Sequence, residues 1–239
     1  MTRHRTWIMK IKNYSDFCAA LLDCGFTMGG GNSEGIFSLI SWDWKQEPPY
    51  DTPVSWHTGD PETDPWEWRM RVLEERRDIA YGKVFFNKSG YITKDWIPYF
   101  LAVRRGDVSL EEAYESGTIS STAKRIYHII TEYGKIPMHE IKRAGGFTQE
   151  DHSRFDKAVT ELQMKMVITM CGRERKMNKN GEGYGWSSTC FCTVEDFWKD
   201  RGVDIPVVDR DEAVNKITRQ VLKLNPDANE RKLKRFING

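Results

Sequence analysis

The sequence lacks several features that would place it in a class at once. No apolar run approaches the roughly 20 residues that a membrane-spanning helix needs. The segment after Arg3 and Arg5 alternates apolar and polar residues, so no secretory signal is expected. The formal net charge is only +1, which excludes the global basic field of a strong non-specific nucleic-acid binder. These absences predict a cytoplasmic protein without a membrane role, in which any binding of nucleic acid depends on local patches.

Metal-site patterns are also missing. The cysteines are odd in number and lie in apolar settings, which suits buried thiols in a reducing compartment. Cys190 and Cys192 alternate in a predicted strand, but no second Cys or His pair at zinc-site spacing accompanies them. The histidines form no HxxxH or HExxH pattern. We therefore expect no metal and no other cofactor.

Residues 123–198 carry the strongest pattern in the chain. Apolar residues at helical spacing predict one helix that ends before Gly134 and a second over residues 138–144. A third predicted helix repeats apolar residues from Phe155 to Met166 at spacings of three and four. This is the order of elements in a winged helix: a helix, a short extended step, two helices and a strand hairpin. Nucleic-acid binding is therefore the first hypothesis.

The third predicted helix is the candidate recognition helix, and the hairpin after it is the candidate wing. An Asn180-Gly181 step between two apolar runs is a strong hairpin signal. The turn is expected to be cationic and to reach phosphates, although solvated Arg and Lys side chains are common on any surface. Acidic neighbours of the helix, such as Asp156 and Glu161, argue against the interpretation. The candidate DNA-binding residues are Arg154, Lys157, Lys165, Arg173, Arg175, Lys176 and Lys179.

The N-terminal half is dense in aromatic residues. Residues 42–68 predict a long irregular segment rich in Trp, Tyr and Pro, which is typical of a packed surface or a pocket. Asp64 is expected to cap a helix over residues 65–77, with Glu67 completing a capping box. The candidate pocket residues are Trp56, His57, Trp66, Trp68, Tyr81 and Lys83. The alternative is an aromatic core with Lys and Arg side chains extending along it.

Other local patterns in this half predict ordinary elements. The glycine-dense residues 28–35 indicate a tight turn with close backbone approach, since no helix start with Lys-Ser or Lys-Thr follows. Residues 36–42 look like a strand. Residues 81–92 could pair as a hairpin or frame a loop, and Thr93 is expected to cap a helix over residues 94–105.

A resemblance to a known family rests on three features. The Leu162 region leads into Cys171-Gly172-Arg173, a basic wing follows, and the returning strand is followed by Glu195-Asp196-Phe197-Trp198. In these features residues 123–199 resemble the middle winged helix of the AlkZ-type DNA glycosylases, bacterial enzymes that excise bulky alkylated bases and unhook interstrand crosslinks. Two predicted helices after the wing agree, and Pro65-Trp66-Glu67-Trp68 loosely matches an aromatic helix ahead of it. The resemblance implies a DNA-repair protein that binds damaged duplex DNA.

One departure from the family affects the chemistry. Members of the crosslink-repair type carry a Gln-x-Gln catalytic motif, whereas the glutamines here stand alone, so those catalytic residues do not carry over. Cleaving an N-glycosidic bond needs an anion to stabilise the sugar cation or activate water, and an aromatic slot for the extruded base. Asp60 and Glu62, flanked by Trp56 and Trp66, offer both and are the candidate catalytic residues. The alternative is that a turn rich in Asp and Pro explains them.

The sequence thus predicts an α+β protein in three parts. These are an aromatic-rich N-terminal region over residues 1–117, a winged-helix domain over 118–201 and a helical tail over 202–239. The leading hypothesis is a winged-helix DNA-binding protein, in which activity as a DNA glycosylase (a hydrolase of N-glycosidic bonds) on alkylated or crosslinked bases remains open. Two alternatives are a non-catalytic DNA-binding regulator and a small-molecule-binding protein that uses the tryptophan-rich loop.

Overall fold

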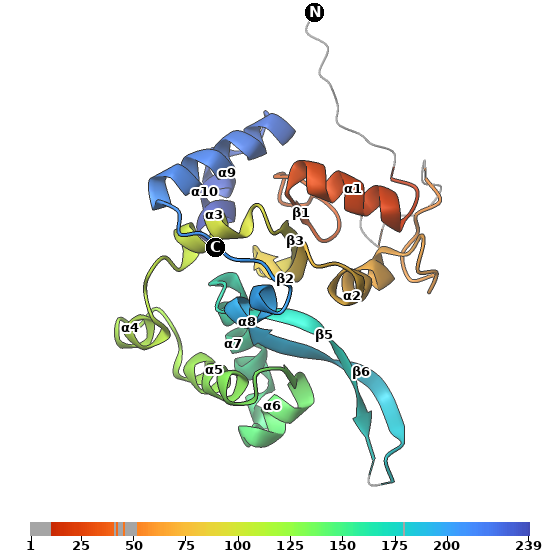
Figure 1. The fold of residues 1–239 in the computed structure, drawn as a ribbon, viewed down its shortest axis with the longest axis vertical. Helices are drawn as coiled ribbons and strands as arrows, with labels where there is room; N and C mark the ends of the chain where they lie inside the picture. The colour runs from red at the N-terminus through yellow and green to blue at the C-terminus, as the bar shows by residue number, and fades with distance from the viewer. Residues whose placement is uncertain (1–10, 41, 43–44, 46–51, 179) are drawn as a thin grey trace, which may run out of the picture.

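A computed structural model describes residues 11–40, 42, 45, 52–178 and 180–239, which fold as two bodies stacked along the long axis (Figure 1). Both bodies mix helices with a three-stranded antiparallel sheet. The upper body comprises α1 (Tyr14–Cys24), β1 (Phe26–Met28), α2 (Pro65–Glu75), β2 (Ile79–Phe85), β3 (Lys88–Thr93), α3 (Ile97–Arg104), α8 (Val194–Lys199), α9 (Arg210–Leu224) and α10 (Glu230–Asn238). The lower body comprises α4 (Leu110–Glu115), α5 (Ser121–Tyr133), β4 (Ile136–Pro137), α6 (Met138–Ala144), a 3-10 turn η1 (Gln149–Asp151), α7 (His152–Met164), β5 (Ile168–Met177) and β6 (Gly183–Thr193).

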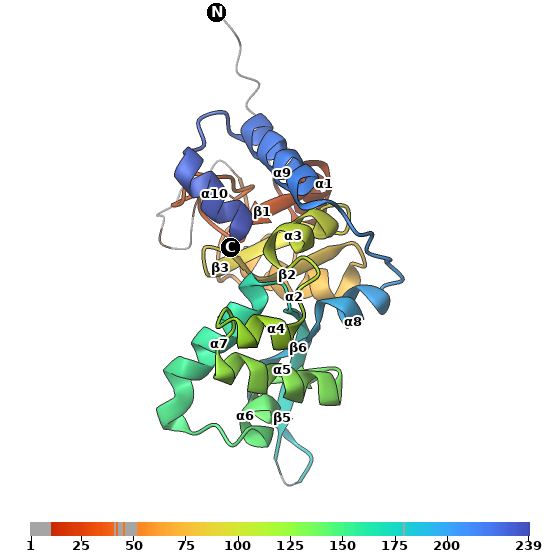
Figure 2. The same ribbon diagram turned by 90° about the vertical axis from the view of Figure 1, so that its left-hand side faces the viewer.

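The upper body is built around aromatic side chains from both ends of the chain. Its sheet has the order β1-β3-β2. Phe85 of β2 stacks on Phe236 of α10 with ring centroids 4.3 Å apart, and Phe100 of α3 meets the edge of Phe26 at 5.3 Å. Ile217 of α9 is fully buried in the same core. The last two helices therefore pack on the N-terminal half, as Figure 2 shows from the side.

The turn between β2 and β3 explains how these strands pair. Phe86 and Asn87 both have positive φ, 52° and 60°, which is the backbone of a two-residue type I′ turn. Tyr81 lies opposite Tyr91 and Gly82 opposite Gly90 in the resulting ladder. Of the two arrangements open for residues 81–92, the structure shows the hairpin.

The glycine-dense segment is a place of close backbone approach, as predicted. The Gly29 amide donates to the Ser89 carbonyl at 2.8 Å, and a Cβ on Gly29 would lie 2.9 Å from that same oxygen. A Cβ on Gly30 would lie 2.8 Å from the Trp56 ring. Side chains at these two positions would collide with β3 and with the indole, so glycine is required for packing.

The lower body has a separate core. Ser120 caps α5 by accepting from the Ala123 amide at 3.2 Å, and Ile126 and Ile130 of this helix are fully buried. They pack with Phe155 and Leu162 of α7 in a cluster distinct from the upper core. The sheet has the order β4-β6-β5, so the short β4 pairs with the returning strand of the hairpin. The three helices and the hairpin expected from the sequence are confirmed.

Two buried polar side chains tie the bodies together. The Gln163 Oε1 atom of α7 accepts from the Lys83 amide of β2 at 2.9 Å, and its Nε2 atom donates to the Val159 carbonyl at 3.0 Å. The Arg104 guanidinium is buried and donates to four backbone carbonyls, those of Val84, Met164, Phe236 and Ile237. Because a buried charge without hydrogen bonds is very costly, this set of acceptors fixes where α7 and α10 meet β2.

Several local predictions are wrong. Residues 36–40 form no strand. The Met28 amide of β1 donates to the Phe37 carbonyl at 3.3 Å, and the Leu39 amide donates to the Thr27 hydroxyl at 2.8 Å. These two hydrogen bonds do not make a strand ladder. α3 starts at Ile97 and not at residue 94, because Thr93 is held in β3 opposite Ile79. α2 ends two residues early, at Glu75.

The tertiary packing also differs from the linear division at residue 201. The apolar residues of α8, among them Phe197 and Trp198, are buried in the upper core, although the sequence-based boundary assigned them to the winged helix. β6 ends at Thr193, whose hydroxyl accepts from the Asp196 amide and starts α8. The chain therefore leaves the lower body at the end of β6.

Candidate nucleic-acid interface

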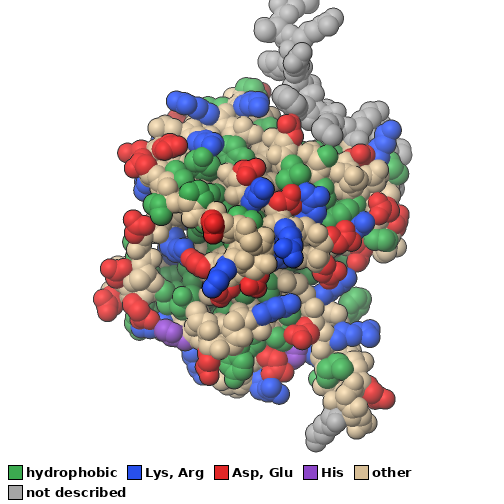
Figure 3. All heavy atoms as spheres, viewed as in Figure 1, with side chains coloured by type: hydrophobic (Ala, Val, Ile, Leu, Met, Phe, Trp, Pro, Cys, Tyr) green, Lys and Arg blue, Asp and Glu red, His purple; other side chains and the backbone are tan. Residues whose placement is uncertain are grey.

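The β5–β6 hairpin projects from the lower body as an arm, visible at the lower right of Figure 3. Its turn is built by Asn178, whose Oδ1 atom accepts from the amides of Asn180 and Glu182, both at 2.9 Å. Gly181 has φ 77°, in the left-handed region that glycine adopts without strain. The hairpin predicted from the Asn180-Gly181 step is confirmed. Its cations are placed differently, since residues 173–176 lie in β5 and not in the turn. Lys179 lies outside the described residues.

An irregularity in the hairpin exposes a tryptophan. Glu174 pairs with Ser188 and Lys176 pairs with Tyr184, so residues 185–187 lie opposite Arg175 alone. Such a bulge bends the strand and redirects its side chains, and Gly185 with φ 65° accommodates it. Trp186 within this bulge is 93% exposed, and Tyr184 and Met177 beside it are exposed too. Sequence reasoning missed these residues. The feature of the sequence that could have indicated them is the pair Tyr184 and Trp186, two aromatic residues two positions apart on a polar strand.

The cations of the hairpin fall into two groups. Arg173 reaches back to α2, where its guanidinium lies 3.3 Å from Glu74 and 3.9 Å from Glu67. Glu67 therefore faces the hairpin, and the capping box expected with Asp64 does not form. Arg175 and Lys176 have no ion pair within the described part of the chain. Their charges are available to a ligand near Trp186.

The candidate recognition helix α7 presents a mixed surface. Arg154 lies 3.6 Å from Asp151, and His152 lies 3.2 Å from Asp156. Glu161, which argued against DNA binding, accepts from both the Ser120 amide and hydroxyl at the start of α5. Its carboxylate therefore helps to hold the start of α5 in place through these two hydrogen bonds.

One side of α7 forms the wall of an open cleft of about 840 Å³. Lys157 and Lys165 line the cleft from α7, and Lys83 lines it from β2. Asn87 and Asn238 complete the opposite wall, next to the C-terminal end of α10. No ion pair holds these three lysines within the residues that the structure describes. Lys83 was predicted to belong to an aromatic pocket. It lies instead in the cleft beside α7, where it contributes a positive charge.

The other predicted pocket residues do not share one cavity. Trp68 and Tyr81 are buried in the upper core, where Trp68 stacks on Phe17 at 5.0 Å and Tyr81 packs on Tyr91 at 4.8 Å. Trp66 is 44% exposed on the other face of α2. The expectation of a single pocket is corrected, because residues 66 and 68 of one helix point in different directions.

The remaining aromatic residues of the set, Trp56, His57 and Trp66, form a cluster of tilted rings near the surface. His57 lies 4.9 Å from the Trp66 ring and 6.2 Å from the Trp56 ring, measured between ring centroids. The Arg69 guanidinium lies 3.3 Å above Trp66. Asp64, fully buried, holds the segment in place by accepting from the amides of His57, Gly59 and Trp66. The predicted cap is thus confirmed, and it also orders the loop before the helix.

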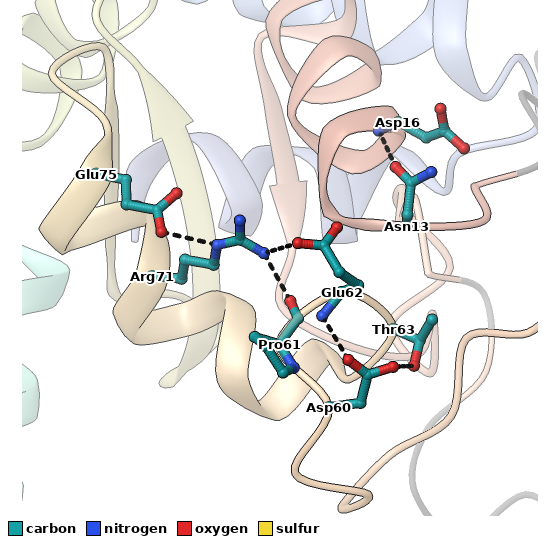
Figure 4. A network of polar contacts seen from close by, with 8 residues as sticks. All are labelled: Asn13, Asp16, Asp60, Pro61, Glu62, Thr63, Arg71 and Glu75. Carbon is teal, nitrogen blue, oxygen red and sulfur yellow. Dashed lines mark hydrogen bonds and ion pairs between the residues drawn. The ribbon is translucent and has the colours of Figure 1, made fainter.

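The candidate catalytic carboxylates lie in an exposed turn (Figure 4). Asp60 accepts from the Thr63 hydroxyl at 2.6 Å and the Glu62 amide at 3.0 Å. These two hydrogen bonds lower the pKa of Asp60 below its ordinary value, because they stabilise the ionised form. Glu62 pairs with Arg71 of α2 at 2.6 Å, and Arg71 also holds Glu75. The turn therefore exposes two carboxylates, and that of Glu62 is already engaged with Arg71.

The described residues lack both a membrane-spanning helix and a metal-binding cluster. None of their helices is long and apolar enough to cross a membrane. Nor do they contain a group of three or more His, Cys, Asp or Glu side chains placed to hold a metal ion.

Comparison with known proteins places this architecture in a family. The family model described as "AlkZ related" matches residues 11–238, nearly the whole chain. The chain belongs to the AlkZ-related family. No curated protein matches it. Among solved structures it is similar to the Streptomyces sahachiroi DNA glycosylase AlkZ, with a TM-score of 0.41 and 11% sequence identity. That match covers 73% of this chain and 50% of the other, so the chain spans about half the length of that glycosylase.

Proposed function

We propose that residues 118–193 of this AlkZ-related protein form a winged helix that binds duplex DNA, with α7 as recognition helix and the β5–β6 hairpin as wing. Two features support the assignment. The order α5, β4, α6, α7, β5, β6 is that of a winged helix. The sheet order β4-β6-β5 places the returning strand in the middle, next to the short strand that follows the first helix.

The observation that carries the proposal is the exposed Trp186 beside Arg175 and Lys176, which form no ion pair within the described residues. An indole in water forgoes the stabilisation that burial would give it, and Tyr184 and Met177 close to it are exposed as well, so this arm presents several apolar side chains to solvent. Arg175 lies opposite the bulge that contains Trp186, and Lys176 follows it. Cations that meet phosphates and an aromatic ring that meets sugars or bases are the two components of nucleic-acid binding.

The face of α7 supplies a second set of contacts. Lys157 of α7, Lys165 just after it and Lys83 of β2 line the open cleft, together with Asp156 and Glu161. Phosphate contacts of this kind set the position of a duplex without reading its sequence. The near-zero net charge of the chain means that such local patches must supply the electrostatic attraction.

The test is the salt dependence of binding to duplex, single-stranded and alkylated DNA. Arg175→Gln with Lys176→Gln is expected to lower duplex affinity and to reduce the slope of log affinity against log salt by about two units. The matched control is Lys12→Gln with Lys94→Gln, which removes the same charge from exposed sites of the upper body. Equal slopes for the two double variants would remove the hairpin from the interface. A wild-type protein that binds no DNA would refute the proposal.

A second candidate function is excision of an alkylated or crosslinked base from the bound duplex. Membership of the AlkZ-related family favours it. The exposed turn adds support, because it presents the Asp60 carboxylate to solvent and a carboxylate is the group that stabilises a sugar cation. In this proposal Asp60 or Glu62 acts on the sugar, and the cluster of Trp56, His57 and Trp66 receives the base.

Single-turnover excision of an alkylated base tests this second candidate. We expect Asp60→Asn or Glu62→Gln to lower the rate by about a hundredfold or more, with DNA affinity unchanged. Full excision by both variants would place the chemistry elsewhere. Binding without release of any base by the wild type would leave a non-catalytic DNA-binding protein.

A further inference from the structure

Two thiols meet at the root of the hairpin. In β5 and β6, Thr169 lies opposite Cys192 and Gly172 lies opposite Cys190, with a register shift between Met170 and Gly172. Cys171 is the extra residue at this shift. It follows Thr169 by two positions, so Cys171 and Cys192 are diagonal neighbours on adjacent strands. The two thiols are therefore near enough for each to shift the pKa of the other.

Both residues line an open cleft of about 800 Å³. The cleft lies between the root of the hairpin, the end of α5 and the segment just after α8. Cys171 is partly exposed, whereas Cys18, Cys24 and Cys190 are buried. A small polar reagent can therefore approach Cys171 from this cleft.

Charged side chains of both signs line this cleft: Lys135, Arg173 and Arg201 together with Glu74, Glu132, Asp196 and Asp200. Lys135 and Arg201 line the same cleft, and the Lys135 Nζ atom lies 3.8 Å from the position that a Cβ on Gly172 would occupy. No ion pair holds Lys135 within the described residues. The Arg201 guanidinium donates to the carbonyls of Phe197 and Leu73, and its Nε atom is buried without a hydrogen-bond partner.

These groups favour ionisation of one thiol of the pair. The neighbouring Cys192 thiol lowers the pKa of Cys171, and Lys135 and Arg201 add to that, against the opposing effects of burial and of Asp200. The Cys171 thiol, with burial, raises the pKa of Cys192. A thiol with a lowered pKa that is reachable from a cleft and lies next to a second thiol is the arrangement of a reactive cysteine with a resolving partner.

We propose that Cys171 and Cys192 form a peroxide-reactive thiol pair, in which Cys171 attacks and Cys192 resolves. The Cys171 thiolate attacks one oxygen of a hydroperoxide, the O–O bond breaks, and the departing oxygen takes up a proton. The Cys192 sulfur then attacks the sulfenic acid on Cys171, an S–S bond forms, the S–O bond breaks, and hydroxide leaves with the Cys192 proton as water. With hydrogen peroxide, two thiols and one peroxide give one disulfide and two waters.

The disulfide would join β5 to β6 where the hairpin leaves the lower body. Arg173, two residues beyond Cys171, holds the hairpin against Glu67 and Glu74 of α2. A covalent bridge at this bulge would restrict how the arm moves relative to α2. The thiol chemistry does not depend on DNA binding, so it stands or falls separately from the proposed function.

The test uses the full, reduced chain treated with hydrogen peroxide. Peptide mapping by mass spectrometry is expected to find a disulfide between Cys171 and Cys192, reversed by dithiothreitol. With Cys192→Ser, a sulfenic acid on Cys171 should be trapped by dimedone, and Cys171→Ser should abolish both products. Cys190→Ser is the matched control and should still give the disulfide.

A measurement on the unmodified wild type makes the result independent of how the variants fold. Iodoacetamide should label Cys171 about ten times faster than Cys18 or Cys190, since thiolate fraction and access control the rate. Equal labelling rates, a bridge between Cys190 and Cys192, or no intramolecular disulfide in the wild type would each overturn the proposal.

Discussion

Trp68 and Trp186 stand in opposite surroundings. Trp68 belongs to the aromatic-rich N-terminal region, is fully buried and stacks on Phe17. Trp186 lies on a polar strand, is 93% exposed and lies opposite Arg175, which forms no ion pair within the described residues. The aromatic residues that are dense in the N-terminal sequence thus lie mainly in the core, whereas Trp186 of β6 lies at the surface. An aromatic residue that its neighbours cannot bury is the better indication of a contact site.

The largest expected effect separates the two tryptophans by stability. Trp68→Ala should reduce the free energy of unfolding by about 3–5 kcal/mol, because it leaves a large cavity in the upper core. Trp186→Ala should change it by less than about 0.5 kcal/mol, as exposed positions usually do. Urea unfolding monitored by circular dichroism measures both. A large loss of stability with Trp186→Ala would mean that the indole packs in the fold.

A second change tests whether the two bodies depend on each other. Gln163→Ala should cost about 1–3 kcal/mol of unfolding free energy, because the Lys83 amide loses its buried acceptor. Gln149→Ala, at the exposed start of η1, is the control and should be nearly neutral. Should Gln163→Ala prove neutral, the contact between α7 and β2 contributes little to stability.

The third prediction reverses the comparison by measuring DNA affinity in place of stability. Trp186→Ala should weaken duplex binding by about 1–3 kcal/mol, which is a factor of roughly 5 to 150, if the indole stacks on a base or sugar. Trp66→Ala removes an exposed indole of α2 and should have a smaller effect on binding. Fluorescence anisotropy with labelled DNA gives both values. If the two variants lose affinity equally, the hairpin has no special role.

The smallest effect concerns the ion pairs between the hairpin and α2. Arg173→Gln should lower the free energy of unfolding by less than about 1 kcal/mol, because its contacts with Glu67 and Glu74 are partly exposed to solvent. It should also change the salt dependence of DNA binding less than Arg175→Gln does, since Arg173 is already paired. A larger change for Arg173 would show that it leaves α2 to contact DNA.

The sequence by itself determined the local elements of the lower body. Apolar spacing predicted α5, α6 and α7, and the Asn180-Gly181 step predicted the hairpin, because helix and turn preferences depend on residues close in the chain. The Asp64 cap and the close approach at Gly29 were predictable for the same reason. Membership of the AlkZ-related family also followed from local features of residues 123–199 and from the helices after them.

Only the tertiary structure decided which side chains are free to act. Burial of Trp68 and Tyr81, the transfer of Lys83 to the cleft beside α7, and the pairing of Arg173 with α2 all depend on partners far away in the chain. The bulges that expose Trp186 and bring Cys171 beside Cys192 depend on strand register, which one extra residue alters. Local preference gives the elements, and long-range packing gives each side chain its neighbours and therefore its chemistry.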